Sequence, residues 1–162
     1  MNLCSYGCGK DKIMFYTGID LSLTGTGLIV IDEDSKIVHQ SLICTGPKNI
    51  MEHRHHYIKE TIKNTIKEFQ PSKIYIEGLS FGSRGQSMLD LAGLHFVIRN
   101  YLFENDIPFE VVPPTTLKKF VTGKGTAKKE LMLLQVYKKF GIEFTDNNIC
   151  DAYCLARYGK KS

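Results

Sequence analysis

The sequence contains no apolar run that approaches the roughly 20 residues a membrane-spanning helix needs. Its start also lacks the basic segment followed by a long apolar one that is typical of a secretory signal peptide. It has no internal repeat and no low-complexity segment. Hydrophobic residues make up 43% and charged residues 23% of the 162 residues. We therefore expect one cytoplasmic globular domain over residues 1–162, with 1–11 as a short N-terminal extension and no membrane contact.

The sequence lacks the second pair of ligands that would complete a zinc site with the first two cysteines. Cys4 and Cys8 resemble half of a zinc knuckle, but no further Cys or His pair follows at a suitable spacing, so a four-ligand zinc site lacks ligands. Reduced thiols are the expectation for all five cysteines. The histidine-rich EHRHH (52–56) likewise has no matched carboxylate or thiol elsewhere, which favours a solvated helix start over a metal site.

Acidic residues are absent from LKKFVTGKGTAKK (117–129), which holds five lysines. The C-terminal ARYGKK adds further positive charge, whereas the net charge of +4 alone decides nothing. Local positive fields of this kind attract polyanions, and nucleic acid above all. A solvated helix face is the alternative, and it is the better interpretation of the lysine run taken alone.

The apolar pattern predicts a mixed α/β layer fold in which three antiparallel strands come first. A long amphipathic helix follows the third strand, and strands and helices then alternate. The expected strands are 12–19, 26–32, 36–43, 72–78 and 107–114, and the expected helices are 49–69, 87–104, 114–121, 126–140 and 146–158.

Three carboxylates stand at the ends of expected elements. Asp20 closes the first strand, Glu77 closes the fourth, and Asp151 lies one turn into the last helix. If the first and fourth strands are neighbours, Asp20 and Glu77 come within reach of one ion, and a helix packed across that edge brings Asp151 to them. Three oxygen ligands without histidine or thiolate suit a hard cation, Mg²⁺ or Mn²⁺. For each residue alone, a helix cap or a surface ion pair is the alternative.

Four motifs, GIDLSLTGTG, IYIEG, KKFVTGKGTAKKE and CDAYCLA, occur in the order and at the approximate spacing found in RuvC-type Holliday-junction resolvases. The resemblance covers about residues 13–158 and is most similar to the phage-encoded branch. It implies a ribonuclease-H-like mixed sheet flanked by helices, and a homodimer acting on branched DNA. The implied activity is that of a structure-selective endonuclease. It nicks four-way junctions symmetrically, with other branched DNA as a further substrate, and leaves 5′-phosphate and 3′-hydroxyl ends.

The resemblance also implies roles for individual residues. Asp20, Glu77 and Asp151 match the metal-binding acids of the family, and Lys118 and Lys129 match two lysines that face DNA. Two Mg²⁺ ions, for which Mn²⁺ substitutes, can activate a water and stabilise the leaving 3′ oxygen in an in-line displacement. Lys129 can offset charge on the scissile phosphate. Within the same basic segment, Lys124 and Lys128 are further DNA-binding candidates.

The sequence departs from the family pattern at the fourth metal ligand. The family places an acid or His three residues before the last Asp, and this position is the neutral Asn148. Asn148 can lend a carbonyl oxygen to Mg²⁺ but supplies no charge. Asp146 is best interpreted as the N-cap of the last helix, with Asn147 as the alternative, and is the other oxygen donor if Asn148 is not a ligand.

A second departure lies in the loop after the fourth strand. Family members have an aromatic residue about three positions after the acid, where this chain has Ser80, and Phe81 follows one residue later. We expect Phe81 to stack on bases at the junction centre and Arg84 to contact DNA. Packing of Phe81 onto the core is the alternative for that residue.

The expected helix 87–104 is apolar on almost every side. A helix that buries one face needs only a stripe, so the second apolar face predicts a partner subunit, and a two-fold dimer presents two equivalent active sites. A central core helix is the alternative.

Two other functions compete with the nuclease. One is a branched-DNA-binding protein with weak catalysis, of which the neutral Asn148 is the symptom. The other is an actin-like nucleotide-binding protein, since the motif DxSxTGTG also resembles a phosphate-binding turn. That class needs a second half with a second phosphate turn, for which 162 residues leave no room.

Overall fold

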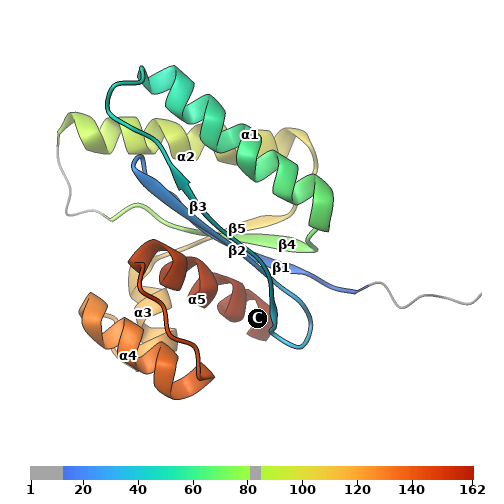
Figure 1. The fold of residues 1–162 in the computed structure, drawn as a ribbon, viewed down its shortest axis with the longest axis vertical. Coiled ribbons are helices and arrows are strands. Elements are labelled where there is room, and N and C mark those ends of the chain that lie inside the picture. Colours follow the sequence, from blue (N-terminus) through green and yellow to red (C-terminus); the bar gives the residue numbers. More distant parts are fainter. Residues whose placement is uncertain (1–12, 81–84) are drawn as a thin grey trace, which may run out of the picture.

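A five-stranded mixed sheet forms the centre of the molecule (Figure 1). The computed structural model describes residues 13–80 and 85–162. The strand order is β3-β2-β1-β4-β5, with antiparallel pairing between β1, β2 and β3 and parallel pairing from β1 through β4 to β5. The predicted ribonuclease-H-like arrangement of three antiparallel strands followed by parallel ones is therefore confirmed. The strands are β1 (Tyr16–Asp20), β2 (Gly25–Ile31), β3 (Ile37–Cys44), β4 (Lys73–Glu77) and β5 (Phe109–Val112).

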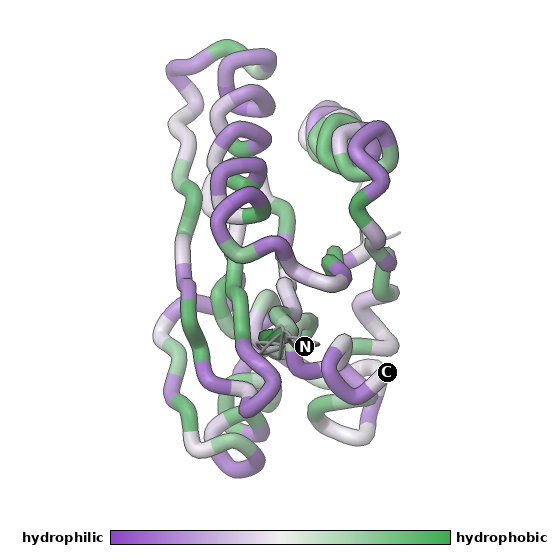
Figure 2. Tube along the Cα trace, turned by 90° about the vertical axis from the view of Figure 1, so that its right-hand side faces the viewer, coloured by the Kyte–Doolittle hydropathy of each residue, from purple (hydrophilic) through white to green (hydrophobic). Residues whose placement is uncertain are grey.

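Helices cover both faces of this sheet (Figure 1). One face carries α1 (Met51–Phe69) and α2 (Gln86–Glu104). The other carries α3 (Pro114–Thr122), α4 (Lys129–Phe140) and α5 (Asn147–Lys161). Hydrophobic and polar residues alternate along α1 in Figure 2, as expected for a helix with one buried face. No helix in the described part of the chain is long and apolar enough to span a bilayer.

Burial along the strands follows from this layering. β2 is buried along its whole length because both of its faces are covered, and its sequence is accordingly rich in Leu, Ile and Val. β3 lies at the edge of the sheet and alternates between buried or half-buried and exposed residues, because side chains on one of its faces are covered and those on the other are not. The core is divided by the sheet into two clusters, one beneath α1 and α2 and one beneath α3, α4 and α5.

Two glycines allow α5 to lie directly on the sheet. A Cβ atom at Gly18 of β1 would come within 1.9 Å of the Ala152 carbonyl oxygen, and one at Gly27 of β2 within 2.1 Å of the Asn148 carbonyl oxygen. Both atoms belong to the α5 backbone, which cannot yield as a side chain can. The backbones of the helix and of these strands are therefore in contact, and the start of α5 lies over the ends of β1 and β2.

The element boundaries differ from the predicted ones mainly near prolines and loops. β5 spans 109–112 rather than 107–114, because Pro108 and Pro113 flank it and lack the N–H group that a strand donates. The helix predicted at 126–140 begins only at Lys129, since the Ala127 N–H closes a turn on the Lys124 carbonyl. The last helix continues to Lys161.

Three cysteines can be described. Cys44, Cys150 and Cys154 are free thiols, in agreement with the prediction for those positions. Cys4 and Cys8, the half zinc knuckle of the sequence, lie outside the described residues.

Candidate active site

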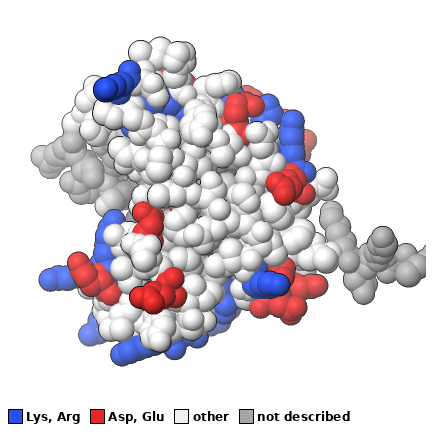
Figure 3. Space-filling view, viewed as in Figure 1, with Lys and Arg blue, Asp and Glu red and all other residues white. Residues whose placement is uncertain are grey.

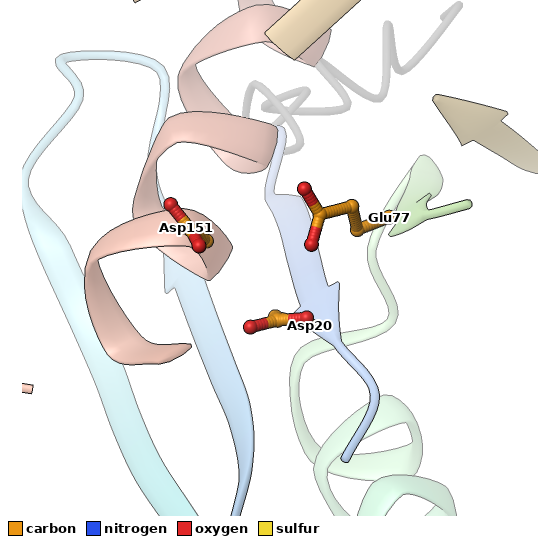
Figure 4. A group of neighbouring side chains, drawn as sticks. All are labelled: Asp20, Glu77 and Asp151. Atoms are coloured by element: carbon orange, nitrogen blue, oxygen red, sulfur yellow. The ribbon is translucent and has the colours of Figure 1, made fainter. Parts of the chain in front are cut away.

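Three acidic side chains converge at one end of the sheet (Figure 4). Asp20 and Glu77 are the last residues of β1 and β4, which are parallel neighbours, so their side chains leave the sheet at the same edge. Asp151 reaches them from α5, which lies across β1. Each residue offers a carboxylate oxygen, and these oxygens all lie within 4.8 Å of one another.

Burial raises the pKa of all three carboxyl groups, and repulsion between carboxylates adds to this for Asp20 and Asp151. Burial first, and then the charges of Glu77 and Asp151, hold the pKa of Asp20 well above its ordinary value. Burial also raises the pKa of Glu77, and that of Asp151 rises to about 7 through burial and the Glu77 charge. The charges of the nearby Lys118 and Lys129 lower the pKa of Glu77 and of Asp151, but the net shift of both remains upward.

This cluster has the chemistry of a divalent-metal site. Asp20 is only 9% exposed, and like-charged carboxylates this close cannot all ionise unless a cation compensates them. The donor set consists of oxygen alone, which fits Mg²⁺ or Mn²⁺ and does not fit the sulfur- and nitrogen-rich sites of zinc. The raised pKa values thus indicate a site in which a bound divalent cation would stabilise the ionised carboxylates.

The turn after Asp20 is held by hydrogen bonds within itself and from α1. The Thr26 hydroxyl donates to the Ser22 carbonyl (2.8 Å) and accepts from the Ser22 N–H (3.1 Å). Arg54, only 7% exposed, donates from Nε to Thr45 Oγ1 (2.9 Å) and from Nη2 to the Leu23 carbonyl (2.5 Å). The solvated helix start predicted for residues 52–56 is therefore wrong for Arg54, which is buried.

The polar residues at the start of α5 have different roles. Asp146 caps the helix by accepting from the Ile149 N–H at 3.0 Å, as predicted. Asn148 donates from Nδ2 to the Gly25 carbonyl at 2.6 Å and lines the same pocket as the three acids. With Nδ2 bound to β2, Oδ1 is the amide atom left for a ligand.

The pocket above the acids has a volume of about 330 Å³ and two lysines in its wall. Lys118 comes from α3 and Lys129 from the first residue of α4. Lys124 and Lys128 are exposed between these helices and do not line the pocket. In Figure 3, lysine and arginine side chains gather along the lower edge of the molecule, over α3 and α4. Phe81 and Arg84 lie outside the described residues.

His95 of α2 also lines this pocket and was not singled out from the sequence. Its side chain is 3% exposed, and burial, followed by the charge of Arg99, lowers its pKa to about 4. The imidazole is therefore neutral at physiological pH. The only signal in the sequence is one polar residue within the apolar GLHFVI, which does not reveal what the residue faces.

The sheet order and the three acids at its edge define a protein of the ribonuclease-H-like class. The chain belongs to the RuvC family, since the family model described as crossover junction endodeoxyribonuclease RuvC matches residues 16–157.

Individual relatives agree with this assignment. The crossover junction endodeoxyribonuclease RuvC of Rickettsia rickettsii is 30% identical over 123 residues, which cover 74% of this chain and 78% of the relative. That of Brachyspira hyodysenteriae is 28% identical over 146 residues, covering 88% and 91%. The structure of Thermus thermophilus RuvC in complex with Holliday junction substrate superposes with a TM-score of 0.78, at 21% identity and with 91% and 96% of the two chains covered.

Proposed function

We propose that this chain resolves four-way DNA junctions as a divalent-metal-dependent endonuclease that nicks two strands symmetrically and leaves 5′-phosphate and 3′-hydroxyl ends. The observation that carries the proposal is the convergence of Asp20, Glu77 and Asp151, within 4.8 Å of one another, in a lysine-walled pocket of a RuvC-family chain. Other branched DNA is included as a second substrate class.

The metal ligands are Asp20, Glu77 and Asp151, with Asn148 Oδ1 as a neutral fourth donor. Mg²⁺ suits this set because it prefers oxygen and retains several waters, and Mn²⁺ substitutes for it. The bound metal, as two ions, would activate a water and stabilise the charge that develops on the leaving oxygen. The burial of Asp20 at the strand end is then explained, because its carboxylate is a ligand.

The lysines divide into two roles. Lys129 and Lys118 stand in the pocket wall, where their ammonium groups offset charge on the scissile phosphate and orient the strand. Lys124 and Lys128, exposed beside the pocket, bind the phosphate backbone farther along. Phe81 and Arg84 remain DNA-contact residues on the strength of the sequence alone.

An exposed apolar stripe on α2 supports a homodimer. Leu89, Phe96 and Phe103 are 67%, 57% and 78% exposed, and their spacing of seven residues puts them on one side of the helix. The second apolar face predicted from the sequence is thus present and uncovered within one chain. A two-fold dimer formed through it brings two copies of the active site to one junction.

Two further points rest on the sequence. The assignment to the phage-encoded branch depends on the four motifs, and a cytoplasmic location fits the proposed DNA substrate. If the chain is phage-encoded, that cytoplasm is the host's.

The test is cleavage of an end-labelled four-way junction in Mg²⁺, with gel-shift binding measured in parallel in Ca²⁺. We expect paired nicks from the native chain, and complete loss of nicking with retained binding for Asp20→Asn, Glu77→Gln and Asp151→Asn. Nicking at the parent rate in any of these variants removes that residue from the site. Junction binding without nicking by the native chain identifies a branched-DNA-binding protein with weak catalysis instead.

A further inference from the structure

A second pocket opens beside the active-site pocket and has no role in the chemistry described above. Its volume is about 410 Å³. It lies between the segment that follows β4, the middle of α2 and the start of α3. The residues that matter for its chemistry are Leu79, His95, Arg99, Val111, Pro113 and Pro114.

The two pockets share a wall. Leu79, Ser80, His95 and Pro114 line both of them, and the shared segment begins directly after the acid Glu77. The second pocket is therefore adjacent to the place where a scissile phosphate would lie at the three acids.

The walls are mostly apolar, and the largest polar group among them is a cation with an unused donor. Leu79, Val111, Pro113 and Pro114 supply hydrocarbon surface. The Nε of Arg99 is buried and has no hydrogen-bond partner among the residues that the structure describes. The guanidinium lies 5.4 Å from the ring centroid of Phe96, a contact that leaves its in-plane N–H donors free. A buried donor left unpaired is costly, so this arrangement fits a ligand that brings its own acceptors.

We propose that this pocket takes an unstacked nucleobase from the nucleotide next to the scissile phosphate, with Arg99 donating hydrogen bonds to the edge of that base. The proline and leucine walls pack against the flat apolar faces of the base, whereas a phosphate would gain nothing from them. Guanine suits the pocket best, because its N7 and O6 accept two hydrogen bonds side by side from an arginine. Arg99 is thus a specificity-determining residue, and this inference rests on the proposed action on DNA.

Two other occupants would account for the same apolar pocket. A side chain of a partner subunit could fill it, since Arg99 is on the helix whose exposed stripe supports the dimer. A backbone phosphate could pair with Arg99 without any base entering. The experiment therefore has to distinguish a bound base from a partner side chain and from a backbone phosphate.

The first measurement is a binding one that does not depend on cleavage. Four-way junctions carry a single 2-aminopurine at each position around the nick in turn, and fluorescence is read with Asp151→Asn as the parent protein. We expect an increase at one position, where the base leaves the stack, and loss of most of that increase in Arg99→Met. Arg157→Met is the matched control, because Arg157 also lies over an aromatic ring, at 4.2 Å, but lines a different pocket.

The second measurement is a cycle of protein and DNA changes in the nicking assay. A junction with guanine at the responding position should be nicked at least about tenfold faster than the same junction with an abasic site there. Arg99→Met should remove that ratio, and Arg99→Lys should reduce it because a single ammonium group cannot bind both acceptors. Arg157→Met should leave the ratio unchanged.

Three results would overturn the proposal. One is the absence of any position with increased fluorescence, and another is an increase that Arg99→Met leaves intact. The third is a shift of Arg99→Met toward monomer in sedimentation, which would show that the partner subunit fills the pocket. Failure of the native chain to nick unmodified junctions counts against the proposed function alone, because the fluorescence measurement still decides whether a base enters.

Discussion

Asn148 is the residue at which this chain leaves the acid or histidine pattern of its family, and the structure gives the amide a second task. Its Nδ2 binds the Gly25 carbonyl at 2.6 Å and so ties the start of α5 to β2. An aspartate at this position would bring one more negative charge to the metal, but it would lose the donor and face the carbonyl oxygen.

The effect of the added charge on metal binding and the effect of the lost hydrogen bond on stability can be measured separately, with and without metal. We expect Asn148→Asp to lower the Mg²⁺ concentration for half-maximal junction cleavage, and Asn148→Ala to raise it without abolishing activity. In EDTA, Asn148→Asp should lose about 1–3 kcal/mol of unfolding free energy, because the Gly25 carbonyl is left unpaired. Metal titrations and urea melts measure both, and Asn147→Asp is the control that adds the same charge outside the pocket wall. A Mg²⁺ midpoint that neither variant moves would exclude Asn148 as a ligand.

Asp151 gives the metal-free protein a pH-dependent weakness. Its pKa of about 7 lies above the ordinary value, so the folded chain favours the protonated form. The contribution of protonated Asp151 to the free energy of unfolding is fully present at low pH. It is lost as the pH rises through about 7. In EDTA at pH 8.5, Asp151→Asn should therefore melt about 2–8 °C above the native chain, with a smaller difference at pH 5. Mg²⁺ should reverse the order, because only the native chain then gains a strong ligand set. Differential scanning fluorimetry across this grid tests the prediction, and equal melting temperatures in EDTA at pH 8.5 contradict it.

At the scale of elements, the position of α5 depends on the absence of two side chains. We expect Gly18→Ala and Gly27→Ala each to cost at least about 2 kcal/mol of unfolding free energy, since the new Cβ meets helix backbone. Both should also weaken Mg²⁺ binding, because lifting α5 moves Asp151 away from Asp20. Gly46→Ala is the matched control, with nothing within 4 Å of the added Cβ and an expected effect within about 0.5 kcal/mol. Urea unfolding of the three variants decides, and a control as damaging as the other two would rule out the packing explanation.

The elements themselves were largely predictable, because each apolar run ends at a residue with a clear reason to stop it. β1 and β4 end at Asp20 and Glu77, and the neighbouring placement of these strands followed from the family resemblance. Arg54 and His95 were not predictable, since a single polar residue in a helix pattern does not show whether it faces water or a pocket. Local sequence fixes the period of an element, whereas the partner of each side chain is set by residues far along the chain.

At the scale of the whole molecule, the uncovered stripe on α2 should control assembly. We expect Phe96→Glu and Phe103→Glu to convert the proposed dimer to a monomer, because a carboxylate in an apolar interface loses its hydration. Junction resolution should then give way to uncoupled single nicks. Tyr137→Glu on α4 is the control, since Tyr137 is similarly exposed at 56% but lies on the opposite layer. Sedimentation equilibrium gives the assembly state, and unchanged dimers in both Phe variants would place the interface elsewhere.

The central helix of the second layer is also the last element of the described chain. α5 packs against β1, β2 and β4, and it carries the third acid of the site. During synthesis on the ribosome, the sheet and the first two acids leave the exit tunnel well before Asp151 does. A growing chain can therefore expose its lysines and meet DNA while it still lacks a complete set of ligands. The proposed cutting of DNA therefore becomes available only after α5 has been made and has docked on the sheet, and a chain that stops before Asp151 holds two of the three acids.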